Sequence, residues 1–183
     1  IIIGSVFVSG LGLKFTQSVI DLSGGVLFVL LCLTAISAII LGMGMTTTAV
    51  YITVAALIVP SLIEAGIIPI AAHMFAFYFG VVSTITPPVA LASFAGAAIA
   101  KSPPMATAVE SSKVGIAKYI VPFAFVYNPS LLMQGPIVWS IYSLIAVLLA
   151  YWLMTFGLEG WFNGALNVYK RILAFVGSVM LIM

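Results

Sequence analysis

The segment between Asp21 and Glu64 carries no charged side chain, and its middle does not suit a helix. Two glycines and three successive threonines stand there, in the sequence GMGMTTTA at residues 42–49. Glycine costs about 1 kcal/mol relative to alanine inside a helix, and β-branched threonine loses rotamer freedom there. A long uncharged segment with such a break predicts two helical arms joined by a polar tip.

The composition places these arms in a membrane. Hydrophobic residues make up 64% of the chain and charged residues 5%, whereas a soluble domain carries about a quarter charged residues. We therefore expect an all-α integral membrane protein. The net charge of +2 gives no reason to expect a nucleic-acid partner, and the single cysteine, Cys32, excludes an intramolecular disulfide. No nucleophile–base pair, phosphate loop or metal cluster is visible, so we do not expect an enzyme.

A second break interrupts the next apolar run, which covers residues 70–100. It reads TITPPV at residues 84–89, where Pro87 and Pro88 remove two backbone donors and disfavour helical geometry at Thr86. Non-helical backbone at membrane depth is tolerated only where it is buried in protein or lines a polar cavity. Paired broken helices are typical of the binding site of a secondary transporter. The chain is therefore predicted to be part of a transporter.

Turns and charges divide the chain into five segments. They are the end of a transmembrane helix with its connection at 1–21, a re-entrant hairpin at 22–64 with its tip at 42–48, a discontinuous helix at 65–100 broken at 84–88, a cytoplasmic amphipathic connector at 101–118, and C-terminal transmembrane helices at 119–183. A short polar connection is expected at 16–25. The hairpin arms, of about 16 residues, are short for a full crossing, but two ordinary spans joined by a tight turn stay open as the alternative. Both ends of the chain look cut, which indicates a fragment of a longer protein.

The basic residues orient these segments. Five of the six lie in the loops at 101–118 and 157–171, and only Lys14 lies on the other side. The positive-inside rule places those two loops in the cytoplasm and the mouth of the hairpin outside. The same orientation follows from two ordinary spans, so it does not test the hairpin.

Several stretches closely resemble the large membrane subunit of tripartite ATP-independent periplasmic (TRAP) transporters. They are GMGMTTTAVY, the arm that holds Pro60, and GVVSTITPPVALASFAGAAIA. The stretch FVYNPSLLMQG and the tail through Lys170 and Arg171 look more like the fused permeases, in which the small membrane subunit is joined upstream. The resemblance runs along nearly the whole chain and corresponds to the C-terminal half of the large subunit.

The resemblance implies an elevator-type carrier built from two inverted repeats, of which this chain is one half. It implies import of a small organic anion, a carboxylate, with sodium as the coupling ion and no cofactor. An extracytoplasmic solute-binding protein would deliver the substrate to a multi-pass permease in the bacterial or archaeal cytoplasmic (inner) membrane. Sodium would bind where the hairpin tip meets the second break. The common family pattern has proline before the threonine pair of the tip, where this chain has Thr46.

Backbone and hydroxyl oxygens of the two breaks suit sodium, a hard cation that prefers oxygen ligands. An anionic substrate would use free backbone N–H groups at the start of a half-helix and hydroxyl donors. Alternatively, the hydroxyls only bond to helix carbonyls or link helices. The candidate substrate- or ion-binding residues are Gly42, Gly44, Thr46, Thr47, Thr48, Thr84, Thr86, Pro87 and Pro88, with sodium at Gly42, Thr47, Thr84 and Thr86.

Two other functions stay open on the sequence. The chain could be an ion channel whose broken helices form a filter, conducting without sodium coupling and without a soluble partner. It could also be a non-transporting structural subunit of a membrane complex, in which both breaks only serve packing. His73, the one histidine, lacks partners for a catalytic or metal-binding role and is expected to be structural.

Overall fold

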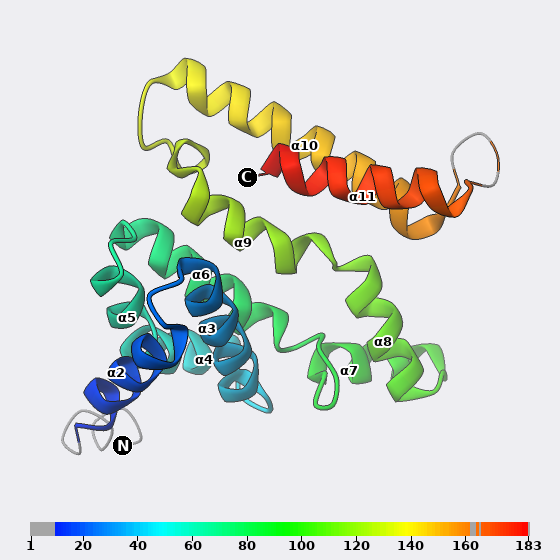
Figure 1. Cartoon of the computed structure of the whole chain (residues 1–183). Coiled ribbons are helices and arrows are strands. Elements are labelled where there is room, and N and C mark those ends of the chain that lie inside the picture. Colours follow the sequence, from blue (N-terminus) through cyan, green and yellow to red (C-terminus); the bar gives the residue numbers. More distant parts are fainter. Residues whose placement is uncertain (1–9, 162–163, 165, 183) are drawn as a thin grey trace. The chain divides into compact units, whose positions relative to one another are not determined.

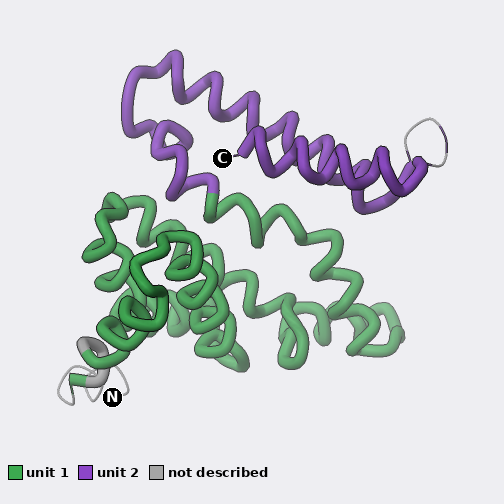
Figure 2. The backbone as a smooth tube through the Cα atoms, viewed as in Figure 1, with its two compact units in different colours: residues 1–123 green, residues 124–183 purple. Residues whose placement is uncertain are grey.

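The computed structural model describes residues 10–161, 164 and 166–182. Within these residues the regular structure is helical, without a β-sheet, so the expected all-α class is confirmed for them. The end of a transmembrane helix that the sequence predicts within residues 1–21 lies partly outside the described residues, which begin at residue 10. Contacts divide the chain into two compact units, residues 1–123 and residues 124–183 (Figure 2). Each unit is described by itself.

Helix α2, Leu11–Ser23, corrects the polar connection that the sequence predicts at residues 16–25. The helix continues through this segment because it has a buried and an exposed face. Thr16, Val19 and Ser23 lie on the buried face, while the residues between them are mostly exposed. It ends where Gly24 and Gly25 adopt positive φ angles of 57° and 78°. Only the end of the predicted connection is therefore a turn.

The hairpin region consists of helices α3, Leu27–Gly42, α4, Thr47–Leu57, and α5, Val59–Glu64. Helices α3 and α4 contact each other, and both contact helix α6, Pro69–Val82 (Figure 1). Helix α4 gives way to α5 at Ile58, because Pro60 has no N–H group to continue the hydrogen-bond ladder. The N–H of Ser61 bonds to the carbonyl of Ile58, and the carbonyl of Leu57 accepts a hydrogen bond from the buried hydroxyl of Thr16 in α2, over 3.4 Å.

Small side chains bring α3 and α6 together. Alanines on both helices are at most 6% exposed; they are Ala35, Ala38, Ala71, Ala72 and Ala76. Helices in a membrane associate through close van der Waals packing, which small residues allow. Phe75 fills the remaining space, with its ring centroid 4.8 Å from that of Phe79 and 5.4 Å from that of Phe123. This packing fixes the end of α6, where the second break begins.

The chain leaves helix after Val82 and resumes it in α7, Leu91–Ala100. Helix α8, Pro104–Val114, packs against α7 and is linked to it by a hydrogen bond between the hydroxyls of Ser93 and Ser111. Helix α9, Ala117–Tyr127, follows and runs from the first unit into the second. The connector that the sequence predicts at residues 101–118 is thus mostly helix α8.

The second unit consists of a 3₁₀ turn, η1, Pro129–Leu132, and helices α10, Ile137–Glu159, and α11, Val168–Ile182. Helices α10 and α11 pack against each other. Among the described residues, α10 is the one helix long and apolar enough to cross a membrane, whereas α3, α4, α6 and α7 are apolar but shorter.

Arg171 joins the ends of α10 and α11. Its Nε donates to the carbonyl of Gly157 over 2.9 Å, and one of its terminal nitrogens donates to the carbonyl of Leu158 over 2.7 Å. These carbonyls belong to the last turn of α10, which has no further N–H groups to satisfy them. The guanidinium therefore acts as a C-terminal cap, a role that the position of Arg171 in an expected loop did not suggest.

We expect Arg171→Ala to lower the free energy of unfolding of the permease by about 1–2 kcal/mol, because two charge-assisted hydrogen bonds to helix carbonyls are lost. Thermal unfolding of the purified protein measures the change. Lys170→Ala is the matched control, since it removes the same charge from an exposed side chain to which the structure gives no hydrogen bond. Equal unfolding temperatures for the two variants would show that the cap contributes nothing.

Candidate functional site

The tip between α3 and α4 is a turn at residues 43–46. It is held by hydrogen bonds from the N–H of Met43 to the carbonyl of Ile40 and from the N–H of Met45 to the carbonyl of Gly42. Gly44 has a φ angle of 80°, which favours glycine because residues with a side chain are strained there. Thr46 has φ −71° and ψ 149°, the backbone angles of a proline in an extended segment. The family's proline would therefore fit the same backbone.

Helix α4 presents free hydrogen-bond donors at this tip. The N–H groups of Thr47, Thr48 and Ala49 open the helix, and no acceptor for them lies among the described residues. The side chains of Thr46, Thr47 and Thr48 are exposed, and the structure gives their hydroxyls no partner. Free amides at a helix N-terminus, together with the helix dipole, favour an anion.

The hydroxyls of the second break satisfy the end of α6. Ser83, Thr84 and Thr86 each donate a hydrogen bond to a carbonyl of the last turn of that helix, over 2.6–2.7 Å. This is the alternative role that the sequence left open for such hydroxyls. It does not exclude a cation, because a hydroxyl oxygen that has donated its proton keeps its lone pairs.

The second break is closed across its own ends. The N–H of Ala92, in the first turn of α7, donates to the carbonyl of Thr84 over 3.0 Å. Between these residues Pro87 and Pro88 are joined by a cis peptide bond and provide no N–H donors. The start of α7 is thus partly satisfied internally, in contrast to the start of α4.

The end of α3 lies directly against the second break. A Cβ atom built on Gly42 would lie 2.7 Å from Cβ of Ser83 and 3.0 Å from Cγ1 of Val50, and closer still to the Ser83 hydroxyl. A Cβ atom on Gly80 of α6 would lie 2.9 Å from the same Val50 methyl group. Gly42 and Ser83 are both buried. Two glycines therefore allow the start of the tip and the end of α6 to touch.

The predicted site residues are only partly brought together. Gly42 meets Ser83, the residue directly before the second break, and the Cβ position of Gly44 lies 4.0 Å from Cγ1 of Val89 in that break. The hydroxyls of Thr47 and Thr48 have no hydrogen bond to those of Thr84 and Thr86. The two sets of hydroxyls thus belong to adjoining parts of one region but are not hydrogen-bonded to each other.

The sequence did not identify several residues that shape this region. They are Val50, Gly80, Ser83, Ser112 and Tyr119. Gly80 and Ser83, three residues apart in and just after α6, are a pair of small residues on one helix face, a pattern that indicates close helix packing. The sequence gives no comparable signal for Ser112 and Tyr119.

His73 has a partner across the hairpin. Its Nδ1 lies 3.0 Å from the hydroxyl of Tyr51, which links α6 to α4. The ring of Tyr51 also contacts Phe77 edge-on, with centroids 5.7 Å apart. The sequence predicts a structural role for His73 without naming a partner, and the hydrogen bond to Tyr51 is a contact of that kind.

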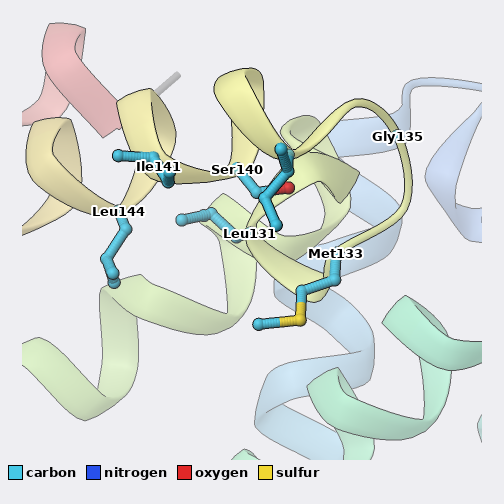
Figure 3. Close-up of a pocket in the computed structure, with 7 residues that line it drawn as sticks. Leu131, Met133, Gly135, Ser140, Ile141 and Leu144 are labelled. Atoms are coloured by element: carbon cyan, nitrogen blue, oxygen red, sulfur yellow. The ribbon is translucent and has the colours of Figure 1, made fainter.

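A pocket of about 350 Å³ lies in the second unit, beside the start of α10. Figure 3 shows it lined mainly by aliphatic and thioether side chains, among them Leu131, Met133 and Leu144. The hydroxyl of Ser140 is buried there without a hydrogen-bond partner. None of the predicted site residues belongs to this lining, and it holds no charged group that would bind an organic anion.

Comparison with known proteins gives one family. The model of the DctM component of the tripartite ATP-independent periplasmic transporters matches residues 1–140, a stretch that includes both breaks and the residues around them. No curated protein and no solved structure matches the chain.

Proposed function

This chain belongs to the DctM family of tripartite ATP-independent periplasmic transporters, and from that membership we propose that it is half of a sodium-coupled carrier for a small organic anion. A DctM component is the membrane permease of such a transporter, so the chain is a membrane protein of a transport system. The observation that carries the finer proposal is the contact of Gly42 with Ser83, which unites the tip and the second break.

Helices α3 and α4 are proposed to enter and leave the membrane on one side, as a re-entrant hairpin. Helices α6 and α7 are proposed to be the halves of one broken transmembrane helix. In support, each of the four is shorter than the ~20 residues that a full crossing needs, and the chain is non-helical between the members of each pair. Two such elements packed together suit the moving part of an elevator-type carrier.

An anionic substrate is proposed to bind at the start of α4. The free N–H groups of Thr47, Thr48 and Ala49 and the hydroxyls of the two threonines supply donors without a charged side chain. No Lys or Arg stands between Lys14 and Lys101. A carboxylate would therefore be balanced by amides, by the helix dipole and by a bound cation.

Sodium is proposed to bind beside the second break. The oxygens of Thr84 and Thr86, the carbonyls of residues 86–88 and the carbonyls of the tip are the available ligands. The carbonyls of residues 86–88 receive no hydrogen bond from a backbone N–H among the described residues, so they are free to bind a cation. Gly42 contributes by letting the tip come close, and Pro87 and Pro88 by keeping the backbone open.

The partners follow from the tripartite family. Its permeases work in general with a solute-binding protein and a small membrane subunit. We propose that here the small subunit is fused upstream, and that the assembly lies in the cytoplasmic membrane of a bacterium or archaeon. The solute-binding protein would hand over the anion on the extracytoplasmic side.

Uptake into proteoliposomes that contain the full permease tests this function. We expect accumulation of a labelled organic acid only when an inward sodium gradient and the solute-binding protein are both present. Conductance without sodium coupling or binding protein would instead indicate a channel. Absence of both flux and conductance in a correctly folded complex would indicate a structural subunit.

A further inference from the structure

Three hydroxyls from three elements meet behind the second break. The hydroxyl of Tyr119, in α9, lies 2.7 Å from Oγ1 of Thr86 and 3.4 Å from Oγ of Ser112, in α8. Ser112 also lies 3.0 Å from the carbonyl of Ile85, the residue that precedes Thr86. The connector helices therefore hold the second break at two successive residues.

The protons of these hydroxyls can be assigned from their partners. Thr86 donates its one proton to the carbonyl of Val82, 2.7 Å away, because a carbonyl oxygen can only accept. Tyr119 is then the donor in its 2.7 Å contact with Thr86, so it has no proton left for Ser112, 3.4 Å away, and that longer contact is not a hydrogen bond in this arrangement. Ser112 donates to the carbonyl of Ile85 or to that of Ala108, each 3.0 Å away. Thr86 is left with one free lone pair.

That free lone pair is the feature that matters for a cation. The Thr86 hydroxyl donates one hydrogen bond, to the carbonyl of Val82, and accepts one, from Tyr119. These two bonds fix the orientation of the hydroxyl and therefore the direction of its remaining lone pair. Tyr119 lines a groove together with Pro87, Ser112 and Ile116, which places its ring beside the prolines of the second break. Removing the tyrosine hydroxyl would leave the threonine oxygen free to change direction.

We propose that Tyr119 is a positioning residue: its hydroxyl orients the Thr86 oxygen toward the sodium ion, while Ser112 holds the neighbouring backbone. The inference rests on the proposed sodium site at the second break. It assigns the connector helices α8 and α9 a part in setting the affinity of that site. Neither helix carries a predicted ligand.

The variant Tyr119→Phe tests the inference in the full permease with its binding protein. Uptake is measured against sodium concentration, and the sodium-induced rise in unfolding temperature is measured without substrate. We expect the sodium concentration for half-maximal uptake to rise roughly three- to tenfold, the effect that loss of one hydrogen bond supports, with little change in maximal rate. The sodium-induced rise in unfolding temperature should fall in parallel.

Matched variants separate positioning from general damage. Tyr151→Phe makes the same change on α10 and should leave sodium dependence as in the wild type. Thr86→Val should raise the sodium concentration for half-maximal uptake at least as much as Tyr119→Phe does. The double variant should have the same half-maximal concentration as Thr86→Val alone, because both changes act through one oxygen. Ser112→Ala should act in the same direction and provides a second test if Tyr119→Phe fails to fold.

Two outcomes would overturn the inference about Tyr119. Only one of them would also overturn the proposed function. If the wild type depends on sodium but Tyr119→Phe and Ser112→Ala keep its half-maximal concentration, Tyr119 does not position a ligand and the proposed function stands. If uptake by the wild type is independent of sodium, the proposed function fails and the inference fails with it.

Discussion

Replacement of Gly42 by alanine is expected to reduce uptake by roughly five- to 150-fold, since overpacking a tight contact costs about 1–3 kcal/mol and 1.4 kcal/mol is a factor of ten. The added methyl group would lie 2.7 Å from Cβ of Ser83, so either the tip or the end of α6 must move away. The two breaks would then separate at the point where they meet. Initial uptake rates in proteoliposomes, normalised to the amount of folded permease, measure the loss.

Two further variants show that the contact, and not alanine itself, is responsible. Gly96→Ala makes the same substitution on α7, where a Cβ atom would meet nothing within 4 Å, and should leave uptake unchanged. Ser83→Gly removes the side chain that the new methyl group meets, so Gly42→Ala with Ser83→Gly should recover part of the uptake lost by Gly42→Ala. Full activity of Gly42→Ala alone would mean that the two breaks need not touch during transport.

The sequence predicts the two breaks because their cause is local. Gly44 at positive φ and the consecutive prolines at 87 and 88 determine backbone shape through their own covalent structure, whatever surrounds them. The composition likewise predicts helices and a membrane location. The backbone at Thr46 is also consistent with a local cause, since its φ and ψ angles are those of the proline that the family pattern has there.

The contacts between segments were not predictable in the same way. Ser112 and Tyr119 reach the second break only because α8 and α9 fold back beside it, and no local pattern encodes that return. Polar residues are frequent at 16–25 and so predict a connection, but frequency does not show which helical face each residue occupies. Thr16 and Ser23 are buried on one side of α2, which only the packed structure reveals.

Replacement of Gly44 by leucine is expected to abolish uptake. A leucine at φ 80° is strained by about 1–2 kcal/mol, and its side chain would enter the space between the tip and Val89, where the proposed substrate and cation lie. Gly25→Leu is the matched control, because Gly25 has a φ angle of 78° and a Cβ atom there would meet nothing within 4 Å. Both variants carry similar backbone strain, but only Gly44→Leu should lose uptake while the protein stays folded.

A leucine at position 44 could also block a channel, so a second experiment is needed to distinguish a carrier from a channel. Chemical labelling of a Thr47→Cys variant makes this distinction. The side chain of Thr47 is exposed at the start of α4, so the introduced thiol should react readily in the absence of ligand. Substrate together with sodium should slow the reaction, and neither alone should slow it as much, because the anion and the cation are proposed to bind side by side. Glu64→Cys, at the far end of the hairpin, should react at the same rate in all conditions. If Thr47→Cys transports normally but its labelling does not respond to substrate and sodium, the tip is not at the substrate, and the binding site must be sought elsewhere.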